Sequence, residues 1–293
     1  MINIHFIVNP IAGSGKHSFS EVFLHGYFEK SNYHITLKLS TYKGHAIDLT
    51  KESINQKADI VVACGGDGTI NEVASTLVET NIPLGIIPVG SGNGLASNLG
   101  IPRNIKKAIA IIKKNTQTRI DVGCVNDRYF FSNTGFGFSA SVIENYENSQ
   151  KRTIYHYLKA TLKAFKAFSN RKESAIEIEG VGTFVNPFLI FISNSNELGY
   201  KVSLTPKASL QDGELDVMIV TKISKFKMLV FGVLMLFKKP ELLKEVTCFQ
   251  TKNIVLVRKQ GTIFESQADG ELLKIKEESV SISVKEKAIV VIS

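Results

Sequence analysis

Asp59-Ile-Val-Val-Ala-Cys64, followed directly by Gly65-Gly-Asp-Gly-Thr-Ile-Asn-Glu72, is the stretch of sequence that decides the fold. The continuous apolar run at its start predicts a strand buried on both faces of a parallel sheet. Apolar residues then recur at helical spacing between positions 70 and 78. Thr69 and Glu72 have the spacing of a capping box and predict that Thr69 caps this helix. The stretch therefore predicts a strand, a glycine-rich turn and an amphipathic helix.

The turn between this strand and this helix has the chemistry of an anion-binding site. Its glycines let the backbone turn sharply and approach a ligand closely. The first amides of a helix suit a phosphate group. A plain tight turn would explain the glycines and Thr69 but not Asp67, because a carboxylate beside a phosphate needs a metal ion, a hydroxyl or a lysine. Asp67 therefore indicates a functional turn.

Two further glycine-rich loops also follow predicted strands. Asn9-Pro-Ile-Ala-Gly-Ser-Gly-Lys16 is not a Walker A sequence, because Pro10 replaces its first glycine and His17 replaces its Ser or Thr. Pro88-Val-Gly-Ser-Gly-Asn-Gly-Leu-Ala96 ends another strand. The carboxyl ends of parallel strands meet at one edge of a sheet, where ligands bind in open α/β folds. None of the loops holds a complete G-x-G-x-x-G, so a dinucleotide site is poorly supported.

The organisation of the chain changes after Arg119. Before it, strand and helix signals alternate, which predicts a doubly wound parallel α/β sheet. After it, strand-like runs dominate and are interrupted by helical stretches at 155–168 and 225–237. We therefore expect an α/β nucleotide-binding domain at residues 1–121 and a mostly antiparallel β domain at residues 122–293. The return of the last strand to the first domain is left open.

The β half contains two Asp-Gly pairs within acidic segments, Asp212-Gly-Glu-Leu-Asp216 and Gln267-Ala-Asp-Gly-Glu271. Asp-Gly is most often a hairpin turn. The second segment carries carboxylates two residues apart, which would project to the same side of an extended chain. This segment is therefore a reasonable source of a general base.

Composition sets the broad class of the protein. The chain has 293 residues and 44% apolar residues, which is ordinary globular composition. A net charge of +8 favours anionic partners such as nucleotides, lipid headgroups or nucleic acid, without choosing among them. Cys64, Cys124 and Cys248 form no CxxC pair and are expected to be buried free thiols in a reducing cytosol. We find no signal peptide at the N-terminus and expect a soluble, cytoplasmic protein.

One apolar run stands out in the second half, at residues 228–237. Its ten residues are too few to cross a bilayer, which takes roughly 20. Lys222, Lys225 and Lys227 precede the run and Lys238-Lys239 follows it. A basic-flanked apolar helix can lie in a membrane interface. It can equally be a core helix with solvated lysines at its ends, and both interpretations stay open.

Together these motifs resemble the diacylglycerol kinase catalytic fold, in particular the soluble bacterial lipid kinases related to sphingosine and ceramide kinases. The resemblance runs from Asn9 to Glu271, with the motifs in the family's order. Gly-Gly-Asp-Gly-Thr on its own also occurs in NAD kinases and resembles phosphofructokinase turns. One departure is Gly94, where diacylglycerol kinases usually place Asp, and it weakens the case for diacylglycerol as the substrate.

The resemblance implies a nucleotide domain, a β-sandwich domain and a cleft between them. It implies these contacts to ATP: Asn9, Pro10, Ile11, Ala12, Gly13, Ser40, Gly65, Gly66, Asp67, Gly68, Thr69, Ile70, Asn71 and Ser91. Ser40 is matched only through the segment Ser40-Thr-Tyr-Lys-Gly-His-Ala46.

It also implies roles for acidic residues. Asp269 or Glu271 would be the catalytic base, with Asp67 as the alternative. A structural Mg²⁺ would be held at Ser209, Asp212 and Glu214 by a carboxylate and two backbone carbonyls. Asp121 would belong to the family's polar network, although an ordinary strand-end aspartate is also a good explanation.

The expected reaction is transfer of the γ-phosphoryl group of ATP to the hydroxyl of a diacylglycerol-like or sphingoid-like lipid. Mg²⁺ is expected to be held partly through Asp67. We expect peripheral contact with the inner face of a membrane, no nucleic acid, and a homodimer as one option. The alternatives are an NAD kinase, for which Asn196-Glu197 is a poor match, and an inactive nucleotide- or lipid-binding regulator. The intact carboxylates argue against the regulator, because a binding protein has little need of a base.

Overall fold

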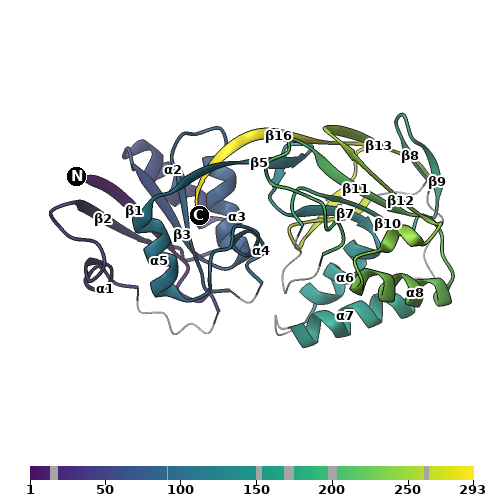
Figure 1. Cartoon of the computed structure of the whole chain (residues 1–293), viewed down its shortest axis with the longest axis horizontal. Coiled ribbons are helices and arrows are strands. Elements are labelled where there is room, and N and C mark those ends of the chain that lie inside the picture. Colours follow the sequence, from purple (N-terminus) through teal and green to yellow (C-terminus); the bar gives the residue numbers. More distant parts are fainter. Residues whose placement is uncertain (14–18, 91, 150–153, 168–174, 197–202, 261–263) are drawn as a thin grey trace. The chain divides into compact units, whose positions relative to one another are not determined.

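The computed structural model describes the whole chain apart from residues 14–18, 91, 150–153, 168–174, 197–202 and 261–263. The chain divides into two compact units (Figure 1). Unit 1 consists of Met1–Val122 together with Glu286–Ser293, and unit 2 consists of Gly123–Lys285. The C-terminal residues therefore fold with the N-terminal part of the chain.

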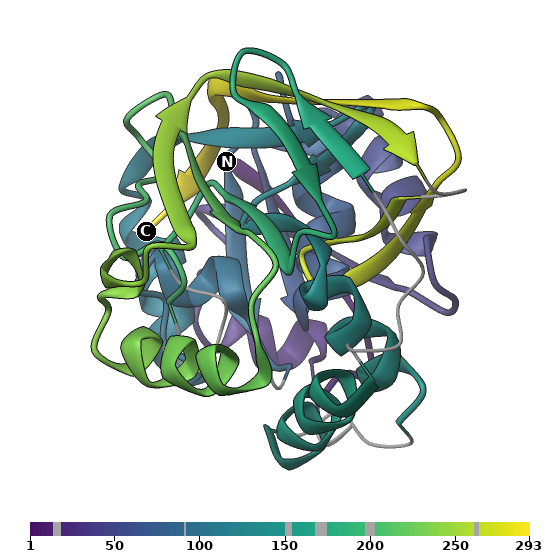
Figure 2. The same cartoon turned by 90° about the vertical axis from the view of Figure 1, so that its right-hand side faces the viewer.

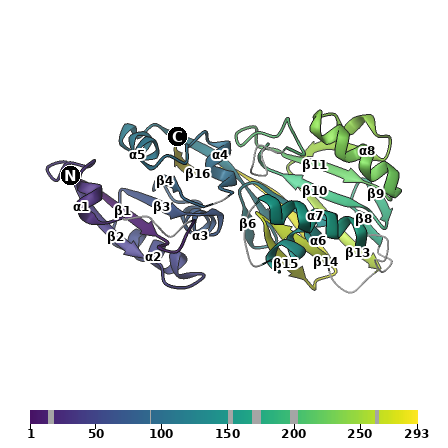
Figure 3. The same ribbon diagram turned by 90° about the horizontal axis from the view of Figure 1, so that it is seen from below.

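Unit 1 is built on a parallel sheet in the order β2-β1-β3-β4, and the C-terminal end of β16 pairs with β4. Its strands are β1 (Ile2–Val8), β2 (Tyr33–Leu39), β3 (Ile60–Gly65), β4 (Leu84–Pro88) and the end of β16 (Ser279–Ile292). Its helices are α1 (Glu21–His25), α2 (His45–Asn55), α3 (Asp67–Leu77), α4 (Gly94–Asn98) and α5 (Ile105–Lys114). Helix α5 covers one face of the sheet, whereas α2 and α3 cover the other (Figure 3).

Strands β3 and β4 are buried along their whole length, as their continuous apolar runs predict. Parallel strands covered by helices on both faces confirm the α/β prediction for the first half of the chain.

The predicted capping box at Thr69 and Glu72 is wrong. The N-cap of helix α3 is Gly66, three residues before Thr69, and the helix begins at Asp67. The carboxylate of Glu72 instead accepts the backbone N–H groups of Gly44 at 2.9 Å and Ala46 at 3.2 Å. Gly44 is the N-cap of α2 and has no side chain to satisfy these amides. Glu72 therefore caps the neighbouring helix rather than its own.

The strands described in unit 2 form two antiparallel sheets. The first, in spatial order, comprises β12 (Val246–Thr251), β11 (Leu215–Val220), β10 (Leu189–Ser193), β7 (Asn133–Gly137), β14 (Phe264–Ala268) and β15 (Glu271–Ile275). The second contains the start of β16 with β13 (Asn253–Gln260), β8 (Ala175–Ile178) and β9 (Gly182–Val185). Strands β5 (Gln117–Val125) and β6 (Arg128–Phe130) pair with each other, and β5 also pairs with β16.

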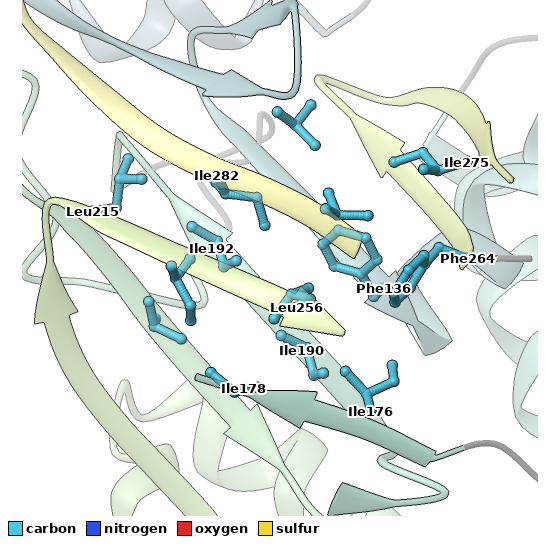
Figure 4. Packing of buried hydrophobic residues seen from close by; sticks show 14 of the residues in the cluster. Phe136, Ile176, Ile178, Ile190, Ile192, Leu215, Leu256, Phe264, Ile275 and Ile282 are labelled. Atoms are coloured by element: carbon cyan, nitrogen blue, oxygen red, sulfur yellow. The ribbon is translucent and has the colours of Figure 1, made fainter. Parts of the chain in front are cut away.

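Apolar side chains from the two sheets of unit 2 meet in one core cluster. Ile190 and Leu215 come from the first sheet, and Leu256 and Ile282 come from the second (Figure 4). Each of these side chains is almost fully buried. The predicted mostly antiparallel β domain is therefore confirmed, with a sandwich arrangement that Figure 2 shows from the side of unit 2.

Three α-helices accompany these sheets among the described residues of unit 2. They are α6 (Phe138–Glu147), α7 (Ile154–Ala167) and α8 (Lys225–Leu236), and the short 3-10 helix η2 (Pro240–Leu242) follows α8. Met228 and Phe231 of α8 are buried in a second apolar cluster, against which Phe165 of α7 also packs. No helix in the described part of the chain is long and apolar enough to cross a membrane.

The cysteines are unbonded, and two of them match their predicted environment. Cys64 and Cys124 are buried, but Cys248 is exposed, so the prediction that all three are buried is wrong. Cys248 lies on β12, the last strand of its sheet, where half of the side chains face solvent.

Candidate functional site

The loops that the sequence singled out meet at the carboxyl edge of the unit 1 sheet. Val8, the last residue of β1, pairs with Leu39 of β2 and with Cys64 of β3, and Gly65 pairs with Pro88 of β4. The strand order changes direction between the neighbours β1 and β3, since β2 lies on one side of β1 and β3 lies on the other. Such a switch point opens a crevice at the carboxyl ends of the strands, where α/β folds bind ligands.

Asn9 connects the loops on either side of this switch point. Its backbone N–H donates to the carbonyl of Cys64 at 2.9 Å, and its side-chain amide donates to Thr69 Oγ1 at 3.2 Å. Its Oδ1 accepts the N–H of Ile11 at 3.1 Å, which folds the Pro10–Ala12 turn back on Asn9. Gly13 has φ +62°, a left-handed conformation that a glycine adopts without strain. The turn from 9 to 13 is thus fixed in shape by local bonds.

The backbones of the second and third loops pass very close to each other. A methyl group on Gly90 would lie 2.5 Å from the Cα of Gly66 and 2.9 Å from Asn93 Oδ1. A methyl group on Gly66 would lie 3.3 Å from the Cα of Gly90. Only glycine at position 90 allows this approach, which brings the N-terminus of α3 beside the loop that follows β4.

The carboxylate of Asp67 fastens these two loops together. Its Oδ1 accepts the N–H of Gly94 at 2.6 Å, and its Oδ2 accepts the N–H of Asn93 at 2.8 Å. Asn93 is the N-cap of α4 and makes no capping bond with its own side chain, which instead closes the loop through Gly90. Asp67 therefore acts as a clamp between loops, and each of its oxygens already faces a backbone amide.

The remaining predicted nucleotide contacts lie in three places. Ser40 directly follows β2, is buried, and donates its backbone N–H to the carbonyl of Val8 at 2.8 Å. Gly65 is the last residue of β3, and Gly68, Thr69, Ile70 and Asn71 form the start of α3, where the first amides of the helix face its N-terminal end. The side chain of Ile70 is buried, so only its backbone can serve a ligand. Ser91 lies outside the described residues.

In unit 2, Asp269 and Gly270 form a two-residue hairpin turn between β14 and β15. Ala268 pairs with Glu271 across the turn, and both turn residues have positive φ, +47° and +81°. The extended arrangement that would place both carboxylates on the same side does not occur, because the chain reverses at Asp269. The two acidic residues consequently have different surroundings.

The carboxylate of Asp269 is held by backbone amides of another strand connection. Its Oδ2 accepts the N–H of Phe131 at 2.7 Å, and its Oδ1 accepts those of Ser132 at 2.8 Å and Asn133 at 3.1 Å. Asp269 also donates its own N–H to the carbonyl of Asn133 at 2.9 Å. These bonds anchor the hairpin turn to the residues that lead into β7.

Glu271 has a side-chain partner instead. Its Oε2 accepts a hydrogen bond from Arg128 Nη2 at 2.7 Å, and its side chain is 29% exposed. Gln267 steadies the turn from the opposite end, because its Oε1 accepts the N–H of Gly270 at 2.9 Å and its amide donates to Asn133 Oδ1 at 2.7 Å. Gln267 lies within the motif, but nothing in the local sequence indicates a role for it, for Arg128 or for Asn133, because their partners are distant along the chain.

The predicted metal residues lie in a turn of unit 2. Asp212 Oδ1 accepts the N–H of Glu214 at 3.2 Å, and Ser209 Oγ accepts the N–H of Gln211 at 3.2 Å. Burial raises the pKa of nearby Asp216, and the charges of Asp212 and Glu214 raise it further. Among the described residues, no three His, Cys, Asp or Glu side chains are grouped so that they could hold a metal ion.

Asp121 lies within β5 rather than at a strand end, so the strand-end interpretation is wrong. It is fully buried, and its Oδ1 accepts the backbone N–H of Lys287 at 2.7 Å. Lys287 has φ +50°, so this bond holds an unusual backbone conformation in β16. Asp121 thereby fixes the C-terminal segment within unit 1.

Comparison with known families accounts for both units. The model of the diacylglycerol kinase catalytic domain matches residues 3–125. The model described as the YegS C-terminal NAD kinase beta sandwich-like domain matches residues 132–293. The two matches together cover nearly all of the chain.

Individual proteins give the same result. A diacylglycerol kinase of Bacillus subtilis is 34% identical over 67% of this chain and 66% of its own length. A YegS-like lipid kinase of Chromohalobacter salexigens is 28% identical over 70% of this chain and 68% of its own length. The crystal structure of a diacylglycerol kinase from Bacillus anthracis has a TM-score of 0.69 at 20% identity, covering 99% of this chain and 96% of that chain, and so shares the fold.

Proposed function

The chain belongs to the diacylglycerol kinase catalytic-domain family, and from this we propose that it transfers the γ-phosphoryl group of ATP to a hydroxyl of a membrane lipid. Its relatives are named diacylglycerol kinase or lipid kinase. The observation that carries the proposal is the carboxyl edge of unit 1, where Asp67 clamps two glycine-rich loops at a switch point. That edge offers amides and close backbone approach, which a triphosphate requires.

The nucleotide is bound mainly by backbone. The N-terminus of α3 presents its first amides, and the Asn9–Gly13 turn, Ser40 and the loop after β4 surround it. Asp67 serves this site by holding the loop at Asn93 and Gly94 in place, rather than as a free carboxylate. Positioning and charge neutralisation are the main demands of phosphoryl transfer, so a rigid set of amides suits the reaction.

Glu271 is the best placed of the three candidate bases. Both oxygens of Asp67 and both oxygens of Asp269 accept backbone N–H bonds that shape loops. Glu271 pairs with a side chain, that of Arg128, and its own side chain is 29% exposed, so its carboxylate can be reached by a substrate. In this proposal Glu271 takes the proton of the lipid hydroxyl. The hydroxyl oxygen attacks the γ-phosphorus of ATP as the bond from that phosphorus to the ADP oxygen breaks. Asp269 positions the turn that carries Glu271.

Mg²⁺ fits the chemistry of the Asp212 turn. A carboxylate and backbone carbonyls are hard oxygen donors, which Mg²⁺ prefers. Burial is the main cause of the raised pKa of Asp216, and the charges of Asp212 and Glu214, which raise it further, are charges that a bound cation would offset. Ser209, Asp212 and Glu214 would hold this structural ion, and Mg²⁺ bound with ATP would neutralise charge on the phosphates.

The relatives do not favour the alternatives. The relatives described above are named diacylglycerol kinase or lipid kinase, and Glu197 of the weak Asn196-Glu197 match lies outside the described residues. The lipid is diacylglycerol-like or sphingoid-like, and because ATP is the donor we place the reaction at the cytoplasmic face of a membrane.

The test is a product assay. Purified protein is incubated with γ-labelled ATP, Mg²⁺, NAD and a mixed lipid extract in micelles, and the labelled product is identified by chromatography and mass spectrometry. A phosphorylated hydroxyl-bearing lipid with unmodified NAD is the expected result. Formation of NADP without labelled lipid would favour the NAD kinase alternative, and binding of ATP without any labelled product would favour the regulator.

A further inference from the structure

Helix α8 is buried on one side only. Met228 and Phe231 are 6% and 7% exposed, whereas Phe226, Leu229 and Leu236 are 73%, 61% and 83% exposed. The helix has no charged residue after Lys227 until Lys238. The core-helix interpretation therefore explains the inner side of α8 and leaves a wide apolar side without a cover.

Helix α7 extends this uncovered apolar surface. Leu158 and Leu162 are 58% and 55% exposed, whereas Ala160 and Ala164 face inward. Phe165 of α7 packs against the same buried cluster as Met228 of α8, so both helices lie over one part of unit 2. Figures 1 and 2 show α7 and α8 on the same side of that unit.

The charges on the two helices all have one sign. Lys159, Lys163 and Lys166 are exposed along α7, and Lys225, Lys238 and Lys239 are exposed at the ends of α8. Neither α7 nor α8 contains an acidic residue. A second copy of this surface would oppose lysine to lysine, whereas an anionic lipid surface complements both the apolar side and the charge.

We propose that the uncovered sides of α7 and α8 form one surface that docks on an anionic bilayer. At 12 residues, α8 is too short to span a membrane and instead lies in the interface with its apolar side among the acyl chains. Such docking would bring the enzyme to its membrane lipid, and in this respect the inference rests on the proposed lipid kinase function. Membrane binding itself needs neither ATP nor turnover, so the docking inference and the proposed kinase function can be contradicted separately.

The test is co-sedimentation of the full chain with phosphatidylcholine vesicles, with and without phosphatidylglycerol. The apolar variant combines Leu229→Gln and Leu236→Gln, and its matched control is Val22→Gln, an 85% exposed apolar residue of unit 1. The charge variant replaces Lys225, Lys238 and Lys239 with Gln, and its control replaces Lys113 and Lys114, which are exposed on α5. Activity on a short-chain, water-soluble lipid alcohol and the solution mass are measured in parallel.

We expect binding to anionic vesicles only, weakened by salt. Each surface variant should lose at least about 10-fold in vesicle affinity, while its control keeps it. Activity on the short-chain alcohol should not change, which separates docking from the chemistry. Absence of vesicle binding, equal binding to neutral vesicles, or wild-type binding by both surface variants would overturn the proposal. A dimer that the Leu229/Leu236 variant converts to monomer would overturn it as well, because the surface would then be an interface between copies.

Discussion

The pairs Asp67-Gly68 in unit 1 and Asp269-Gly270 in unit 2 have the same local sequence and build different structures. The first begins a helix at the edge of a parallel sheet, and the second is the turn of a β-hairpin. In both, the carboxylate accepts backbone amides from a loop far along the chain, 26 residues away for Asp67 and 138 for Asp269. The shared role of the aspartate is therefore to join loops.

The two aspartates differ in the groups that their hydrogen bonds position. Asp67 holds the loops around the first amides of α3, and these amides are left as backbone donors suited to phosphate. Asp269 holds a hairpin turn in place and thereby positions Glu271, the residue that follows the turn. This contrast predicts that damage in unit 1 affects nucleotide binding and damage at Glu271 affects the chemical step.

The largest expected effect is at Glu271. Glu271→Gln should lower kcat by at least about 100-fold, because an amide cannot accept the hydroxyl proton. Asp269→Asn should lower kcat less and lower the melting temperature more, because it disturbs three backbone bonds. Steady-state kinetics and thermal denaturation of both variants check this pair. If Asp269→Asn has the larger loss of kcat with unchanged stability, the roles of the two residues must be exchanged.

A smaller, graded effect is expected where the loops of unit 1 approach each other. Gly90→Ala should weaken ATP binding roughly 10- to 100-fold, since its methyl group would lie 2.5 Å from a backbone atom. Gly66→Ala, with a contact at 3.3 Å, should weaken binding less. ATP affinity is measured by fluorescence titration. Wild-type affinity in both variants would place the phosphates away from these loops.

The smallest expected effect is a pH dependence of the stability of unit 1. His5 lies in the core of unit 1, where burial and then the charges of Lys38 and His34 lower its pKa to about 4 from 6.5, against a smaller opposing effect of Glu52. The unfolded chain therefore binds more protons than the folded one between these values, so the contribution of His5 is full above pH 6.5 and is lost as pH falls toward 4.

Unit 1 should consequently lose stability over that range, and His5→Gln should reduce the loss. Hydrogen exchange of β1 amides, followed by mass spectrometry at a series of pH values, measures it. An identical pH dependence in the variant would assign the acid sensitivity to other groups.

The elements that could be predicted from the sequence are those with strong periodicity. The strand patterns of β1, β3 and β4 and the glycine-rich turns after them were enough to place three loops at one sheet edge. Burial on both faces leaves such strands few alternatives, so the parallel sheet follows from the pattern.

Side-chain partners could not be predicted, because they depend on distant residues. Thr69 and Glu72 match a capping box, yet Gly66 already allows the helix to start earlier and α2 has unsatisfied amides close to Glu72. The bonds from Asp67 to Asn93 and from Asp269 to Phe131 join segments with no common local pattern. The return of the C-terminal residues to unit 1 depends likewise on Asp121 and Lys287, 166 residues apart.

The most direct test of this division between the units is isothermal titration of ATP into four variants under identical conditions. They are Gly90→Ala and Asp67→Asn in unit 1, and Asp269→Asn and Glu271→Gln in unit 2. The account predicts weakened ATP binding in both unit 1 variants, since an amide at position 67 would turn an NH₂ group toward a backbone N–H. It predicts near wild-type binding in both unit 2 variants. Loss of ATP affinity in Glu271→Gln as large as that in Gly90→Ala would contradict it.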